Sequence, residues 1–198
     1  MKRLIPILLV FGAFLGSGEW GWSADFQKGL DAYNKKDYAT ALSEWNSLAE
    51  QGSVSAQLNL GMMYAEGKGA PQDDTSSVKW FTLAAERGNA VAQVNLGFMY
   101  QYGKGITKNE EKAVRWYRLA AEQGNADAQV HLGLMYRSGK GVVQDPIRSH
   151  MWWSIAALQG DHDASERRNY IAKKMTRFQR ETSQYLAREC VRKKYKGC

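Results

Sequence analysis

The sequence predicts an all-α fold in which about four to five antiparallel helix pairs stack into a solenoid with a capping helix at the carboxyl end. Three observations predict it. Similar segments recur at a shift of 36 residues, and residues that start and end helices recur at the same places in each segment. The constant positions of the segments also fall on one arc of about 140° around a helix, as packed positions do.

The repeat is visible when the chain is aligned with itself. The aligned segments read "LSEWNSLAEQGSVSAQLNLGMMYAEGKG", "VKWFTLAAERGNAVAQVNLGFMYQYGKG" and "VRWYRLAAEQGNADAQVHLGLMYRSGKG". A further copy begins "MWWSIAALQGDHDA" and then departs from the pattern. A period of this length is typical of repeats whose helix pairs bury their apolar faces only against neighbouring pairs.

Each unit contains a first helix, which in the third copy spans about residues 126 to 137. Asn125 precedes it, and asparagine is a residue type that accepts a hydrogen bond from the free N–H groups of a first turn. The equivalent residues are Ser53, Asn89 and Asp161. A helix is therefore predicted to begin after each of these residues.

The second helix of the same copy spans about residues 146 to 159. It begins after Asp145, with Pro146 at the first helical position, where the missing N–H costs nothing. It ends at Gly160, where glycine can take the left-handed conformation that closes a helix. The equivalent starting residues are Asp37, Asp73 and Asn109.

A lysine stands between two glycines in each inter-helix loop, at Lys68, Lys104 and Lys140. A phosphate-binding loop needs four residues between its first glycine and a Gly-Lys pair, followed by Ser or Thr for magnesium. Here a glycine follows the lysine instead. The glycines therefore predict a turn, and no nucleotide site.

These residues resemble the Sel-one-like repeat (SLR) family, a relative of the tetratricopeptide repeat (TPR). The segment "AVRWYRLAAEQGNADAQVHLGLMYRSGKGV" carries nearly every position of that pattern, and the resemblance covers about residues 25 to 176. It implies a right-handed SLR/TPR-like solenoid. The segment "FQKGLDAYNKKDYATALSEW" departs from it, because its inter-helix connection is five residues shorter than the later ones, and it is predicted to form a TPR-like amino-terminal pair.

The amino end, residues 1–23, is predicted to be a signal peptide. Lys2 and Arg3 precede an apolar run at residues 4–15, which is shorter than the roughly 20 residues that span a bilayer. Cleavage before Ala24 and cleavage before Glu19 both fit. We therefore expect an exported protein, periplasmic in the first place with an extracellular location as the alternative, whose solenoid covers residues 24–164.

The carboxyl region, residues 165–198, is predicted to form basic capping helices. It carries eleven Lys and Arg against three Glu, whereas residues 24–164 are mildly acidic. Thr176 and Gln179 form a capping box, which predicts a helix from about residue 177. Its predicted apolar face covers the last repeat and consists of Phe178, Thr182, Tyr185 or Leu186, and Cys190.

Two further expectations concern the same region. Cys190 and Cys198 are the only cysteines, and an exported setting favours a disulfide between them; free thiols or an intermolecular bond are the alternatives. The basic side chains are candidates for weak contact with anionic lipid or an acidic partner. The alternative is a solvated face of the capping helix.

No catalytic, metal or cofactor site is predicted. The histidines are His131, His150 and His162, and no two have the i, i+4 spacing of a helical metal site. His150 takes the place of valines in other units, so we expect it to be partly buried. The aromatic residues Trp45, Phe81, Tyr117 and Trp153 are expected to pack between helices opposite the alanines at 84, 120 and 156, and burial is also favoured for Trp80, Trp116 and Trp152.

Positions that vary between units are candidates for partner binding, because positions that support the stack stay constant. The polar varying positions lie within about 40° of one another on the first helices. The predicted partner-binding residues are Asn59, Asn95, His131, Glu66, Tyr102 and Ser138. In the related solenoids this helix lines the concave side, so the resemblance implies a groove; simple solvation is the alternative. Alanine at Asn95, Tyr102 and His131 together is expected to abolish binding and leave thermal stability nearly unchanged.

The SLR resemblance implies a monomeric exported adaptor that binds another protein and no nucleic acid. Two alternatives stay open. One is an immunity protein that neutralises a secreted toxin such as a phospholipase effector. The other is hydrolysis of β-lactams, which is attributed to cysteine-rich relatives with a cysteine pair in each repeat; this chain has no such pairs.

Overall fold

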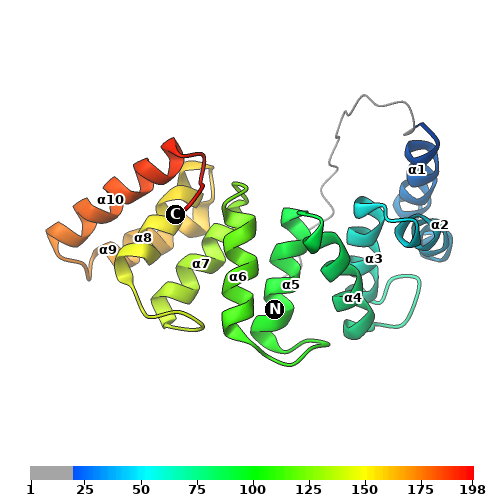
Figure 1. Ribbon diagram of the computed structural model, residues 1–198, viewed down its shortest axis with the longest axis horizontal. Helices are drawn as coiled ribbons and strands as arrows, with labels where there is room; N and C mark the ends of the chain where they lie inside the picture. The colour runs from blue at the N-terminus through cyan, green and yellow to red at the C-terminus, as the bar shows by residue number, and fades with distance from the viewer. Residues whose placement is uncertain (1–19) are drawn as a thin grey trace. The chain divides into compact units, whose positions relative to one another are not determined.

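The computed structural model describes residues 20–198, which form ten α-helices and no strand (Figure 1). The apolar run at residues 4–15 and the cleavage position before Glu19 lie outside the described residues. The chain divides into two compact units, Met1–Arg87 and Gly88–Cys198. The predicted boundary after residue 164 lies inside a helix of the second unit, α9 (His162–Ala172).

The first unit contains α1 (Trp20–Asn34), α2 (Tyr38–Glu50), α3 (Val54–Glu66) and α4 (Asp74–Glu86). The second unit contains α5 (Ala90–Tyr102), α6 (Glu110–Ala121), α7 (Ala126–Ser138), α8 (Pro146–Leu158), α9 (His162–Ala172) and α10 (Arg177–Arg192). Successive helices pack as neighbours from α1 to α4 and from α5 to α9, and α10 packs against α8, so the all-α fold of adjacent helix pairs is confirmed.

Every predicted N-cap residue begins its helix. In each case the side-chain oxygen accepts a hydrogen bond from a backbone N–H of the first turn, and each such cap contributes about 1 kcal/mol. These residues are Asp37, Ser53, Asp73, Asn89, Asn109, Asn125, Asp145 and Asp161. The predicted capping box is also present, because Gln179 N–H donates to Thr176 Oγ1 while Gln179 Oε1 accepts from Thr176 N–H.

The Gly-Lys-Gly segments are inter-helix turns, as predicted. The first glycine of each turn closes a helix in the left-handed conformation, with φ 68° at Gly67, Gly103 and Gly139. The connections that contain them, such as 67–73, have seven residues, whereas the α1–α2 connection at 35–37 has three. It is therefore four residues shorter, and the predicted difference of five was wrong. Lys36, with φ 64°, supplies the left-handed turn there, and Asp37 caps α2 directly afterwards.

An aromatic residue on the second helix of a pair packs against a glycine on the first. The aromatic residues are Trp45, Phe81, Tyr117 and Trp153, and all four are fully buried, as predicted. A Cβ atom on the glycine would lie closer than 3.0 Å to the ring, so only glycine fits. The pairs are Gly29 with Trp45, Gly61 with Phe81, Gly97 with Tyr117, and Gly133 with Trp153. The alanines at 84, 120 and 156 are also buried. The contact of each ring with a glycine was not predicted.

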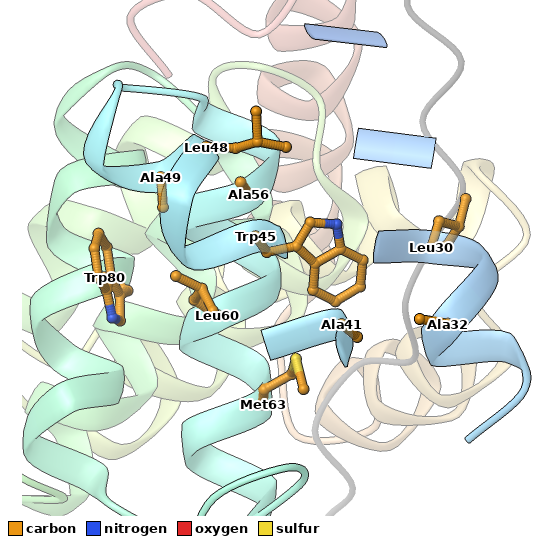
Figure 2. Packing of buried hydrophobic residues seen from close by; sticks show 10 residues of the cluster. All are labelled: Leu30, Ala32, Ala41, Trp45, Leu48, Ala49, Ala56, Leu60, Met63 and Trp80. Atoms are coloured by element: carbon orange, nitrogen blue, oxygen red, sulfur yellow. The ribbon is translucent and has the colours of Figure 1, made fainter. Parts of the chain in front are cut away.

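Figure 2 shows the apolar cluster around one of these rings in the first unit, where Trp45 lies among Leu30, Ala41, Leu60 and Met63. The ring also stacks on Phe26, with ring centroids 5.8 Å apart, and its Nε1–H donates to the Phe26 carbonyl. The indole N–H is thus satisfied inside an apolar cluster, which removes the cost of burying it.

Buried glutamines hold the first helices in place. Gln57 Nε2 donates to the Ala49 carbonyl at 3.1 Å, and Gln129 Nε2 donates to the Ala121 carbonyl at 3.5 Å. In the second unit, Gln159 Nε2 also donates to Gln129 Oε1 at 2.8 Å. Gln57 and Gln129 thus each donate to one carbonyl in the last turn of the preceding helix, where no intrahelical partner exists.

The carboxyl-terminal helix folds back onto the other helices of the second unit. α10 packs against α8 and buries Ser183, Ala187 and Cys190. The predicted apolar face was therefore wrong in part, because Phe178 and Tyr185 are exposed. The predicted disulfide between Cys190 and Cys198 is present, with Cα atoms 5.5 Å apart.

Removing this disulfide, by replacing both cysteines with serine, is expected to lower the free energy of unfolding by about 2 kcal/mol. The physical reason is that the bond restricts the unfolded chain, and a loop of this length predicts an effect of that order. Urea denaturation followed by circular dichroism measures it. A reducing agent should destabilise the parent protein by a similar amount and leave the serine variant unchanged; equal stability of parent and variant would contradict the prediction.

Candidate partner-binding site

The predicted partner-binding residues are distributed over both units. Asn59 and Glu66 lie on α3 of the first unit. In the second unit, Asn95 and Tyr102 lie on α5, and His131 and Ser138 lie on α7.

Two of these residues support the fold itself. Asn59 and Asn95 are buried, and Asn95 Nδ2 donates to the Val91 carbonyl one turn earlier in α5. A buried amide that satisfies its own helix backbone is a structural element. The triple alanine variant that includes Asn95 is therefore now expected to lose stability, in place of the nearly unchanged stability expected from the sequence.

Aromatic rings surround two of the predicted residues of the second unit, Tyr102 and His131, and we call Phe98, Tyr102, Tyr117 and His131 the Tyr102 cluster. The rings of Phe98 and Tyr102 lie 4.6 Å apart on α5. The rings of Tyr117 on α6 and His131 on α7 stack at 4.6 Å with nearly parallel planes. The cluster therefore contains side chains of three successive helices.

Hydrogen bonds fix the orientation of the inner ring of the cluster. The Tyr117 hydroxyl donates to Gln101 Oε1 at 2.8 Å. Burial raises the pKa of Tyr117 well above its ordinary value, and the neighbouring Tyr102 adds to this effect. The phenol therefore stays neutral at any physiological pH. Gln101 could not be predicted from the repeat, because Ala65 and Arg137 stand at the equivalent positions.

The outer part of the Tyr102 cluster is accessible. Tyr102 is 48% exposed and Phe98 is half-buried. The Lys104 ammonium group lies 5.8 Å from the centre of the Phe98 ring, a distance at which a cation is attracted by the ring face. This surface therefore offers one aromatic hydroxyl, one ring face and one positive charge.

The remaining predicted residues have different surroundings. Ser138 is exposed, and its hydroxyl donates to the Leu134 carbonyl at 2.8 Å. Glu66 forms an ion pair with Lys68 at 2.7 Å, and Lys68 also donates to the Tyr33 hydroxyl at 2.6 Å. Glu66 and Tyr33 both raise the pKa of Lys68. Lys68 thus ties its turn to α1, so the lysine has a structural contact that the sequence did not reveal.

The other histidines lie apart from this cluster. His150 is buried on α8, and its Nδ1 lies 2.7 Å from Ser183 Oγ of α10 in a hydrogen bond. Burial lowers the pKa of His150 to about 4, and Arg168 and Arg180 contribute to this shift. His162 is exposed and lies 3.8 Å from Glu166. The sequence underestimated how deeply His150 is buried.

The second aromatic set is mostly in the core. Trp80 and Trp152 are buried, and Trp116 is half-buried. Among residues 20–198, no group of three or more His, Cys, Asp or Glu side chains is arranged to hold a metal ion. In the same part of the chain, no helix combines the length and the apolar character that crossing a bilayer requires.

Comparison with known proteins identifies the repeat. The model of the Sel1 repeat matches residues 54–89, 90–125 and 126–161. These three segments are the three helix pairs α3–α4, α5–α6 and α7–α8. None of the proteins with curated annotation matches the chain.

Two solved structures are similar to the chain. One is c5321, a protective antigen present in uropathogenic Escherichia coli strains that displays an SLR fold; it is 36% identical, with a TM-score of 0.74 over 79% of this chain and 33% of that one. The other is a Sel1 repeat protein from Oxalobacter formigenes, 35% identical, with a TM-score of 0.66 over 71% of this chain and 56% of that one. The chain thus matches a third of the first structure and just over half of the second.

Sel1 repeat proteins are generally protein-interaction modules and typically lack enzymatic activity. The repeat matches cover more than half of the sequence, and each matched segment contains one helix pair. The chain therefore belongs to the Sel1 repeat family.

Proposed function

We propose that the protein is an exported interaction module that binds one protein partner, as a monomer, through the accessible part of the Tyr102 cluster. The observation that carries the proposal is the exposed Tyr102 ring, which packs on the half-buried Phe98. Tyrosine supplies a large contact area at low cost in side-chain entropy, and such residues dominate binding energies at protein interfaces.

The cluster is ordered before a partner arrives. Phe98 supports Tyr102, and the Tyr117 hydroxyl is held by Gln101 beneath the His131 ring. A surface whose side chains are already fixed loses less conformational entropy on binding. Since Glu66 and Ser138 replace Tyr102 in the neighbouring repeats, the proposed site is specific to the repeat at residues 90–125.

Export is part of the proposal and is supported by two features. The predicted signal peptide directs the chain out of the cytoplasm. The disulfide between Cys190 and Cys198 suits an oxidising compartment, such as the periplasm. Fractionation of the native cells tests this part: the mature protein is expected in the periplasmic fraction, and recovery of an uncleaved chain from the cytoplasm would contradict it.

Replacing Tyr102 with alanine is expected to weaken partner binding about 30-fold, which corresponds to about 2 kcal/mol for a central aromatic residue. The thermal stability should stay nearly unchanged, because the ring is half exposed. Affinity capture from the native envelope, followed by mass spectrometry, identifies the partner, and titration of that purified partner measures the affinity.

Leu119→Ala is the matched control, because Leu119 is 46% exposed on the second helix of the same repeat. This variant should bind normally. Equal affinity of the Tyr102→Ala and parent proteins would refute the proposed site. The identity of the captured partner separates an envelope adaptor from an immunity protein, because only the latter binds a secreted toxin.

A further inference from the structure

The outward side of α10 carries aromatic side chains that the protein does not bury. Phe178 is 74% exposed and Tyr185 is 57% exposed. They are seven residues apart, so they lie on one side of the helix about 10 Å apart along its axis. The opposite side of α10, with Ser183 and Ala187, packs against α8. We call the exposed side, with Phe178, Tyr185 and Arg188, the outer face of α10.

Positive charges continue this face toward the carboxyl end. Arg188, Lys193, Lys194 and Lys196 are exposed, and within residues 20–198 no carboxylate forms a salt bridge with them. By contrast, Arg177 pairs with Glu181 and Arg192 pairs with Glu189. The acidic residues of α10 are thus neutralised by arginines of α10, and a surplus of positive charge remains.

The final turn holds its lysines in a fixed place. The disulfide joins Cys198 to Cys190, and the backbone N–H of Tyr195 donates to the Cys190 carbonyl at 2.8 Å. The Tyr195 ring lies against Gly124 in the turn between α6 and α7. The lysines at 193, 194 and 196 therefore extend from an anchored turn beside the end of α10, and do not belong to a free tail.

Charge complementarity indicates what this face binds. Residues 165–198 have a net charge of +8, from eleven Lys and Arg and three Glu, whereas residues 24–164 have a net charge of −2. A negatively charged surface therefore attracts this region and not the rest of the chain. Each cation near an anionic bilayer adds independently to binding, and aromatic rings occupy the headgroup layer.

We propose that the outer face of α10 binds the surface of an anionic phospholipid membrane. Phe178 and Tyr185 lie in the headgroup layer, and Arg188 with the lysines of the final turn contacts the phosphates. An acidic polypeptide would use the same cations, and competition by polyglutamate distinguishes it from a membrane. A membrane surface accommodates the rings and the cations together, because its headgroups and phosphates extend over the whole length of the helix.

Sedimentation with vesicles tests the proposal. The parent protein is expected to sediment with vesicles that contain phosphatidylglycerol, at low salt and less at moderate salt, and to stay in solution with neutral phosphatidylcholine vesicles. All variants carry the same amino terminus, so any affinity of that segment for lipid is common to them. Absence of binding to the anionic vesicles at low salt would overturn the proposal.

Charge reversal tests the cations. Arg188→Glu with Lys196→Glu is expected to reduce vesicle binding at least about tenfold, since each cation contributes about 1 kcal/mol near an anionic surface. The control is Lys35→Glu with Arg115→Glu, which makes the same change in net charge at exposed positions elsewhere. An equal loss in the control would show that only net charge matters, and would overturn the assignment to α10.

Phe178→Ser tests the aromatic contact, and Leu158→Ser is its control, because Leu158 is 72% exposed at the end of α8. Only Phe178→Ser is expected to weaken vesicle binding, by about tenfold. If Phe178→Ser binds normally and polyglutamate displaces the vesicles, the face is an acidic-polypeptide site and the membrane proposal fails. Tyr102→Ala should bind vesicles normally, so failure of the partner proposal and failure of this one are distinguishable.

Discussion

Replacing Gly133 with alanine is expected to destabilise the second unit by about 2 kcal/mol, although alanine is the better helix former by about 1 kcal/mol. Gly133 lies within α7, and a Cβ atom at this position would overlap the five-membered ring of Trp153. The indole cannot move away freely, because its Nε1–H donates to the Val130 carbonyl at 3.1 Å. Overlap and loss of this hydrogen bond therefore outweigh the gain in helix propensity.

A double-mutant cycle isolates the contact. Trp153→Ala alone is expected to cost about 4 kcal/mol, since it leaves a cavity in place of a fully buried ring. In the Trp153→Ala background, Gly133→Ala no longer meets the indole and should raise stability by about 1 kcal/mol. Urea denaturation followed by circular dichroism measures all four proteins. The same loss from Gly133→Ala in both backgrounds would contradict the proposed packing.

Acidification is expected to remove about 3 kcal/mol of stability through His150 alone between pH 7 and pH 4. Burial lowers the pKa of this histidine to about 4, whereas in the unfolded chain it is about 6.5. Well above pH 6.5 the histidine is neutral in both the folded and the unfolded state, so the full stability of the protein is present there. As the pH falls below 6.5, the unfolded chain takes up a proton that the folded chain does not, and stability is lost, with about 2 kcal/mol gone at pH 5.

His150→Asn separates this effect from the other titrations. The asparagine amide can still hydrogen-bond with Ser183, but it takes up no proton in this range. The difference in unfolding free energy between parent and variant, measured by urea denaturation from pH 7 to pH 4, should change by the amounts above. A difference that stays constant with pH would show that His150 does not resist protonation in the folded state.

The helix boundaries could be predicted because they depend on local chemistry. Asp145 and Asn125 cap their helices through contacts within a few residues, so the sequence contains the whole interaction. The repeat then strengthened the prediction, because residue types that can cap a helix occur at the equivalent position of each copy. The length of the connection between α1 and α2 was predicted less accurately, because Lys36, a residue with no turn preference, takes the left-handed conformation.

The faces of α10 could not be predicted in the same way. A helical pattern assigns the largest apolar residues to the core, and that reasoning chose Phe178 and Tyr185. The structure buries Ser183 and Ala187 instead. Small side chains permit close packing of α10 on α8, where Ser183 also meets the buried His150. This choice depends on a partner thirty-three residues away in the sequence, and no local pattern contains it.

Burial of Asn59 and Asn95 was hidden for a related reason. A polar residue that varies little, Asn in two units and His in the third, is compatible with either a binding surface or a satisfied buried amide. The hydrogen bond of Asn95 to the Val91 carbonyl decides between them. By contrast, the glutamines at 57, 93 and 129 are identical in the three full copies, and that constancy beside the buried alanines could have identified their structural role.

The contact between an aromatic ring and a glycine closes within a single helix pair, on residues that one pair supplies entirely. Duplication or deletion of a whole 36-residue segment would therefore carry its own internal contact with it and leave the others intact. A change in length by complete repeats would thus keep each ring-to-glycine contact. Only contacts between neighbouring repeats, such as those of Tyr117 with His131 and of Gln129 with the Ala121 carbonyl, would have to form anew.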